Sequence, residues 1–196
     1  MKPLFFLLCI SLNSQSLPEK FVANTNLLFK DTLGNHINFP LSGGYQALNG
    51  QIFDYDNDGL QDLFILNSGE SKPWHFEQSE AKSWQFVQQK NELTGLKVQN
   101  WFYLIDMDHD GDFDVLSFDE FKLLTLQENI TQHGVHYFEE AKRIKTDLGE
   151  SIQPDVACLP VLYDLNKDGN LDLFLTTSTE GNIRYLKNQN GKNFHL

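Results

Sequence analysis

The sequence predicts an all-β protein built from three similar antiparallel units. Three observations support this fold class: short apolar runs, an Asp-rich loop that recurs three times, and turn signals such as Asn190-Gly191 between the runs. No long segment keeps the 3.6-residue period of an amphipathic helix. Repeated antiparallel sheets of this length are typical of propeller blades, so we expect three β-propeller-like blades in a partial or open propeller.

The recurring loops occupy residues 54–62, 106–114 and 164–172, and they share the pattern D-x-[DN]-x-D-G-x-x-D. Apolar residues precede each loop, at 51–53, 101–105 and 161–163. Apolar residues also follow each loop, at 63–66, 115–118 and 173–176. Apolar runs rich in aromatic and β-branched residues, bounded by Asp, Asn and Gly, indicate strands. Each loop is therefore predicted to connect two strands.

A second repeated feature closes each unit. Trp74–Phe86 and Tyr185–Phe194 each place an aromatic residue on either side of a polar turn, and His136–Phe138 is a weaker counterpart. Glu139–Lys145 is the one short candidate for a turn of helix. We therefore expect one repeat domain over residues 17–196, with blades near 25–86, 87–138 and 139–196.

The first 16 residues have the order of features found in a secretory signal peptide. Lys2 gives a positive start, Leu4–Leu12 is an apolar run too short to span a bilayer, and Ser14 and Ser16 suit the positions before a cleavage point. No other stretch approaches the ~18 apolar residues of a membrane helix. We expect a secreted or cell-surface protein, with the periplasm as an alternative.

Net charge and cysteine content limit the function further. The formal net charge of −12 argues against nucleic acid as a partner, because phosphates attract basic surfaces. Beyond the predicted signal peptide only Cys158 remains, so no intramolecular disulfide is expected. A secreted domain without disulfides needs another means of stabilisation, and bound metal ions are a plausible one.

The loop pattern matches the chemistry of Ca²⁺, a hard cation that takes six to eight oxygen ligands. Carboxylates at positions 1, 3 and 5 of a tight loop converge on one centre, and Gly at position 6 permits the sharp turn. The carbonyl at position 7 and the Asp at position 9 complete the predicted shell. The predicted ligands are Asp54, Asp56, Asp58, the Leu60 carbonyl and Asp62; Asp106, Asp108, Asp110, the Asp112 carbonyl and Asp114; and Asp164, Asn166, Asp168, the Asn170 carbonyl and Asp172.

Two consequences follow from this ligand assignment. The third loop has one carboxylate fewer, so we expect it to bind Ca²⁺ most weakly. An EF-hand is excluded, because position 12 is Ile65, Ser117 or Leu175 in place of the bidentate Glu, and each lies in a predicted strand.

The three loops with their flanking apolar runs resemble the FG-GAP/VCBS repeats, which include the calcium-binding blades of integrin α-chain propellers. The resemblance extends over nearly all of residues 17–196, although no literal Phe-Gly…Gly-Ala-Pro occurs. It implies β-blades stabilised by up to three calcium ions and a role in extracellular adhesion or ligand recognition. It does not specify the ligand.

Other functions have weaker support. We expect no catalysis, because every well-organised carboxylate cluster belongs to a predicted metal loop and the six His residues are scattered. The alternative is a scaffold segment of a larger secreted enzyme, such as a polysaccharide-degrading hydrolase or lyase. A purely structural repeat without a ligand is a third interpretation. Exposed aromatic residues would suit an extracellular protein or glycan partner: Trp74 and Trp84 are candidates, whereas Trp101 is expected in the core. Further blades in a longer chain, or self-association, would cover the end sheets.

Overall fold

The computed structural model describes residues 28–37, 48–67, 69–81, 83–90, 93–130, 136–155, 159–176, 181–189 and 194–195. Within these residues every named element is a strand, which confirms the all-β prediction. The same residues contain no helix long and apolar enough to cross a membrane. The predicted signal peptide, Cys158 and the Asn190-Gly191 turn lie outside the described residues.

The first sheet has six strands in the order β2-β1-β6-β5-β4-β3. Its pairs are antiparallel except β1 with β6, which is parallel, so the expectation of purely antiparallel sheets is wrong at this one pair. The strands are β1 (Leu28–Lys30), β2 (His36–Ile37), β3 (Asn49–Phe53), β4 (Asp62–Leu66), β5 (Trp74–Gln78) and β6 (Gln85–Gln88).

The second and third sheets each have four antiparallel strands, in the orders β10-β9-β8-β7 and β11-β12-β13-β14. The strands are β7 (Phe102–Ile105), β8 (Asp114–Phe118), β9 (Leu124–Gln127), β10 (Lys142–Arg143), β11 (Val161–Tyr163), β12 (Asp172–Thr176), β13 (Ile183–Asn188) and β14 (Phe194–His195). The six strands predicted on either side of the loops are thus present.

The fourth strand of the second sheet differs from the prediction. Lys142 and Arg143 pair with β9, so this sheet extends past the predicted boundary at residue 138. The segment considered for a helical turn, Glu139–Lys145, contains a two-residue strand instead, because Leu126 and Thr125 of β9 pair with Lys142 and Arg143. Tyr137 and Phe138, the predicted counterpart of the closing strand, form only isolated bridges.

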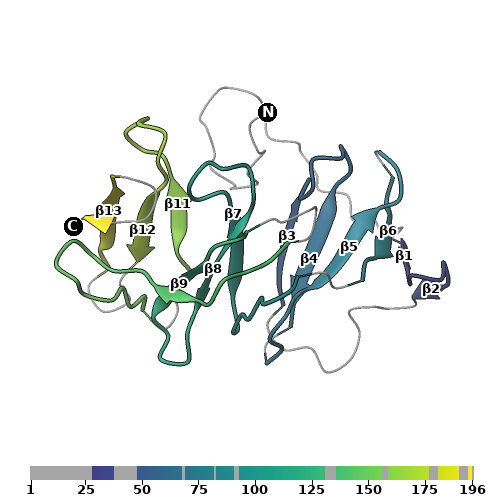
Figure 1. Cartoon of the computed structure of the whole chain (residues 1–196), viewed down its shortest axis with the longest axis horizontal. Coiled ribbons are helices and arrows are strands. Elements are labelled where there is room, and N and C mark those ends of the chain that lie inside the picture. The colour runs from purple at the N-terminus through teal and green to yellow at the C-terminus, as the bar shows by residue number, and fades with distance from the viewer. Residues whose placement is uncertain are drawn as a thin grey trace.

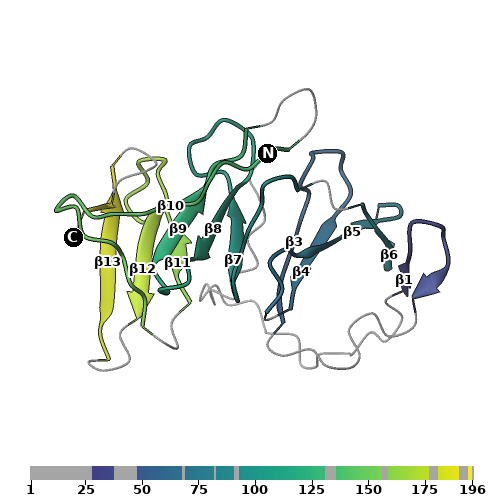
Figure 2. The same ribbon diagram turned by 60° about the horizontal axis from the view of Figure 1, so that its bottom comes forward.

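The three sheets lie side by side in an array that does not close into a ring (Figures 1 and 2). One buried cluster, which includes Phe64 and Phe102, joins the first and second sheets. Another, which includes Leu116 and Leu173, joins the second and third. Trp101 belongs to that cluster, as predicted. Burial of apolar surface between neighbouring sheets is thus what holds the array together.

The two end sheets differ in exposure. On the side of the first sheet that faces away from the second, Phe76 and Phe86 are buried together with Phe29 of β1. On the corresponding side of the third sheet, apolar side chains remain in solvent: Tyr163 is 57% and Ile183 68% exposed. Ile52 is also 57% exposed on the outer side of the first sheet, so the two ends differ in that the first has a buried aromatic cluster and, among the described residues, the third does not.

Candidate metal-binding loops

Each predicted metal loop connects two consecutive antiparallel strands of its sheet: β3 to β4, β7 to β8, and β11 to β12. The loops are neighbours along one edge of the array (Figure 1). The rings of Phe53 and Phe113 lie 4.7 Å apart between the first and second loops. His109 Nε2 lies 2.6 Å from the Gly169 carbonyl oxygen, which links the second and third. The loops thus form a continuous acidic edge.

The backbone of all three loops follows one path. The glycine at position 6 has a φ of 91°, 95° or 94°, as the sequence predicts, because a side chain there would be strained. Position 4 is also left-handed, with φ of 60–63°, although it has Asn, His or Lys: Asn57, His109 and Lys167. Left-handed backbone is uncommon for such residues, so the surrounding hydrogen bonds must enforce it.

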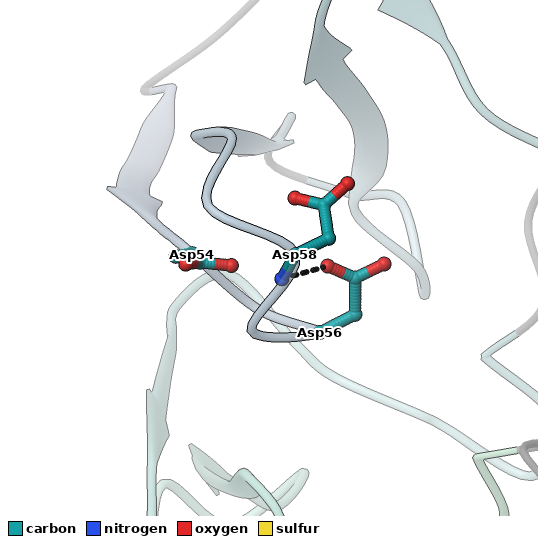
Figure 3. A group of neighbouring side chains, drawn as sticks. All are labelled: Asp54, Asp56 and Asp58. Atoms are coloured by element: carbon teal, nitrogen blue, oxygen red, sulfur yellow. Dashed lines mark hydrogen bonds between the residues drawn. The ribbon is translucent and has the colours of Figure 1, made fainter. Parts of the chain in front are cut away.

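The first loop gathers three carboxylates. Asp54, Asp56 and Asp58 each place an oxygen within 4.8 Å of the others. Figure 3 shows Asp56 and Asp58 on the same side of the loop, joined by the Asp58 N–H, which donates to Asp56 Oδ1 at 3.2 Å. Asp54 Oδ2 accepts the Gly59 N–H at 3.1 Å. Asp54 Oδ1 is buried and has no hydrogen-bond partner among the described residues.

The second loop repeats this arrangement. Asp106, Asp108 and Asp110 also place oxygens within 4.8 Å of one another. Asp106 Oδ1 is again buried without a hydrogen-bond partner in the described part of the chain. Burial raises the pKa of Asp106, and burial with neighbouring carboxylates raises that of Asp56. A buried carboxylate oxygen without a hydrogen-bond partner costs folding free energy, and a bound metal ion at either cluster could supply the missing partner.

The third loop is different, because each of its carboxylate oxygens has a partner within the protein. Asp164 accepts the N–H groups of Asp168 at 3.1 Å and Gly169 at 3.0 Å, one on each oxygen. Asp168 Oδ1 accepts the Asn170 N–H at 2.9 Å. Asp168 Oδ2 lies 3.5 Å from the Lys187 ammonium.

The position-9 aspartates, Asp62, Asp114 and Asp172, lie at the base of the loops and are at most 3% exposed. In each loop Oδ2 accepts the N–H of position 2, at 2.8 Å from Tyr55 and 3.3 Å from Met107 and Leu165. These aspartates are not part of the groups within 4.8 Å. Their role as metal ligands stays a prediction, whereas their role as hydrogen-bond acceptors for the loop backbone is evident.

The neighbouring strand supplies a second partner to each position-9 carboxylate. His75 Nε2 lies 2.6 Å from Asp62 Oδ1, and the N–H groups of Asn129 and Asn188 donate to Oδ1 of Asp114 at 2.9 Å and of Asp172 at 3.0 Å. The Tyr185 hydroxyl donates to Asp172 Oδ2. Asp114 has no such side-chain donor among these bonds, and burial raises its pKa to about 7.

Sequence reasoning missed these supporting residues. A signal was present, because His75 and Tyr185 each lie 13 residues after their aspartate. Asn129 and Asn188 also share a function: each side-chain amide donates to the carbonyl at loop position 8, of Phe113 or Leu171. An alignment of the units beyond the loops would have paired these residues.

The two tryptophans suggested as exposed partner-binding residues differ in their exposure. Trp84 is 59% exposed, as suggested, whereas Trp74 is only partly exposed in β5 and packs against the cluster around Phe76. The carbonyls of Leu60, Asp112 and Asn170 stay predicted ligands.

The fold and the loops together define a β-repeat protein with acidic loops, and comparison with known families agrees. A family model described as FG-GAP-like repeat matches residues 54–117, which extend from the first residue of the first loop into β8. No curated protein and no solved structure matches the chain. The matched region contains the first two loops, the two with gathered carboxylates.

Proposed function

We propose that this chain is a calcium-stabilised, extracellular β-repeat protein that acts through protein recognition and without catalysis. The observation that carries the calcium assignment is the buried, unpartnered oxygen of Asp54 and of Asp106, each inside a cluster of three carboxylates. An all-oxygen donor set suits Ca²⁺, and a tight loop suits its flexible coordination. The FG-GAP-like repeat at residues 54–117 supports the same assignment.

In this proposal Asp54, Asp56 and Asp58 hold one ion, and Asp106, Asp108 and Asp110 hold another. Bound Ca²⁺ supplies positive charge that offsets the repulsion among carboxylates. The chain itself positions the loops: Gly59 and Gly111 turn the backbone, and buried Asp62 and Asp114 fix it to the strands. Each ion thereby stabilises the connection between two strands.

Thermal unfolding with and without calcium tests this function. We expect the Tm to rise with calcium concentration, because a ligand that binds only the folded state stabilises it by mass action. Mg²⁺ should be a weaker substitute, since it requires near-octahedral geometry. An unchanged Tm after addition of EDTA would contradict the proposal.

A paired variant provides the control. Asp56→Asn with Asp108→Asn removes one charge from each cluster while keeping side-chain shape, and should abolish most of the calcium-dependent rise in Tm. Asp31→Asn is the matched control, because Asp31 lies in the turn between β1 and β2 and, among the described residues, its carboxylate bonds to Leu33 and Asn35 of that turn. It should leave the calcium response unchanged.

The open face of the third sheet supports the recognition half of the proposal. Phe174, two residues after Asp172, is paired with Val161 on one side and Tyr185 on the other. The residues at the same offset in the other sheets, Phe64 and Leu116, are fully buried against the next sheet. The third sheet thus exposes the positions through which this chain packs one sheet on another.

The occupant that we propose for this face is a second copy of the chain. The aromatic cluster on the outer side of the first sheet is already buried, which disfavours head-to-tail stacking, so two chains would meet through their open third sheets in a two-fold dimer. Light scattering should show a dimer in calcium that Tyr163→Asp with Ile183→Asp converts to a monomer. A monomer at all concentrations, or glycan binding that the same variant abolishes, would replace this assignment.

A further inference from the structure

The strand beside each metal loop carries one residue whose charge differs between the three units. Glu77 is paired with Asp62 across β4 and β5. In the second sheet Val115 pairs with Gln127 in antiparallel register. One residue further toward the loop, Asp114 is therefore opposite Glu128. In the third sheet Leu173 pairs with Leu186, so the next pair is Asp172 with Lys187. The equivalent residues are thus Glu, Glu and Lys.

We propose that Lys187 is a tethered cation that takes, in the third loop, the place that a bound calcium ion takes in the first two. The inference rests on the proposed function, because it assumes that the first two loops bind calcium. It goes further by making the third loop independent of metal.

The hydrogen bonds of the third loop support this assignment. Its three carboxylates have six oxygens, and five of them accept a hydrogen bond from a backbone N–H. The sixth, Asp168 Oδ2, forms an ion pair with the Lys187 ammonium at 3.5 Å. By contrast, an oxygen of Asp54 and one of Asp106 are buried without a partner among the described residues. The third loop has no such atom. Lys187 offsets part of the negative charge of the third loop, whereas the first two loops have a glutamate at the equivalent position.

The position of the equivalent residues in the other sheets points the same way. The Lys187 ammonium lies 3.5 Å from Asp168 Oδ2, on the strand beside the third loop. Glu77 occupies the equivalent position beside the first loop, as the cross-strand partner of Asp62. A glutamate there adds negative charge to the first loop, and so favours an external cation. Glu128, the equivalent residue beside the second loop, pairs with the Lys142 ammonium at 3.2 Å. Its negative charge is therefore partly offset, which makes the surroundings of the second loop intermediate between those of the first and the third.

The Lys187 ammonium competes with calcium for the loop carboxylates because it is held next to them by the chain. Its local concentration therefore stays the same at any calcium concentration in solution. Lys187 belongs to β13, and the hydrogen bond between the Asn188 N–H and Asp172 holds this strand beside the loop. Any calcium ion would have to displace the ammonium and would find one carboxylate fewer than in the other loops. The tethered lysine therefore makes the third loop selective against metal.

The test counts calcium ions per chain by equilibrium dialysis, with native mass spectrometry as a second readout. We expect two ions in the unmodified chain and three in Lys187→Glu, which restores the charge found at Glu77. The matched control is Lys167→Glu, the same charge change within the same loop at exposed position 4, and it should leave the count at two. The mirror variant Glu77→Lys should lower the count to one, whereas Glu80→Lys, in the turn after β5, should not.

Three ions in the unmodified chain, or two in Lys187→Glu, would overturn the inference while leaving the proposed function intact. No bound calcium in any variant would overturn the proposed function and this inference with it. Lys187→Gln covers the case in which the Glu variant misfolds. It removes the tethered charge alone, and should make hydrogen exchange at the Gly169 and Asn170 amides sensitive to EDTA. Unchanged exchange in Lys187→Gln would also count against the tethered cation.

Discussion

The first and third loops share a sequence pattern and a backbone path but balance their charge differently. In the first loop three carboxylates lie together, and Asp54 has a buried oxygen without a partner among the described residues. In the third loop both oxygens of Asp164 accept a backbone N–H. Asp168 accepts the Asn170 N–H with one oxygen and pairs with the Lys187 ammonium through the other. The comparison teaches that the D-x-[DN]-x-D-G-x-x-D pattern specifies a turn, and in our proposal the neighbouring strand decides whether that turn needs an ion.

The largest effect should come from the aspartate at the base of the third loop, which we propose to be independent of calcium. Asp172→Ala removes the acceptor for the Leu165 N–H, the Asn188 N–H and the Tyr185 hydroxyl. The Asn188 N–H is buried and would be left unpaired, which costs about 1–3 kcal/mol, and the loss of the two part-buried bonds adds to this cost. Urea unfolding should give the same loss in calcium and in EDTA. A loss confined to calcium would make Asp172 a metal ligand and weaken the contrast between the loops.

Asp58→Ala should have the next largest effect, and only in calcium. The variant is expected to lose the ion of the first loop and to keep that of the second. At a calcium concentration a hundred times Kd, loss of one ion costs about 2.7 kcal/mol of stability. In EDTA the sign should reverse, because one of three mutually repelling carboxylates is gone. Denaturant titration in both media measures this, and equal destabilisation in both would show that Asp58 acts without a cation.

Asn188→Ala and Asn129→Ala form a matched pair across the third and second sheets. Each deletes a side-chain amide that donates to the carbonyl at loop position 8, at 3.1 Å for Asn188 and 3.3 Å for Asn129. Loss of one such bond costs about 1 kcal/mol, and Asn129→Ala also removes the contact of Asn129 Nδ2 with His136 Nδ1 at 3.2 Å. The cost for Asn188→Ala should be the same with and without calcium. The cost for Asn129→Ala should shrink in EDTA, where the second loop is already weakened. The opposite pattern would reverse the assignment of the two loops.

The smallest effect concerns position 4. Lys167 has a φ of 60°, a conformation that costs a side-chain-bearing residue about 1 kcal/mol. Lys167→Gly should therefore stabilise the third loop slightly, by about 0.5 kcal/mol after the entropy cost of glycine is included. Asn57→Gly should be near neutral, because Asn tolerates left-handed backbone. The two Tm values compared with the unmodified chain would measure the difference, and a lowered Tm for Lys167→Gly would show that the lysine side chain contributes to the loop.

Much of this architecture was predictable from local sequence. The alternation of apolar runs with Asp-rich loops predicted β3, β4, β7, β8, β11 and β12, because both signals lie within a few residues of each other. The left-handed glycines at position 6 followed from the same pattern. The three carboxylates gathered in each of the first two loops also follow, because alternate residues of a tight turn converge.

Features that depend on distant residues were not predictable in this way. β10 consists of Lys142 and Arg143, which have no apolar signal and form a strand only because β9 offers an open edge. The parallel pairing of β1 with β6 joins segments far apart in the chain. The charge balance of the third loop depends on Lys187, whose proximity to Asp168 arises from the register of β12 with β13.

Hydrogen exchange with and without EDTA tests the contrast between the loops most directly. The reporters are the N–H groups of Tyr55 and Met107, which bond to the aspartates of the first two loops, and of Leu165, which does so in the third. We predict that chelation exposes Tyr55 and Met107 to exchange while Leu165 keeps its protection. Equal loss at all three amides, or no loss at any of them, would contradict the account.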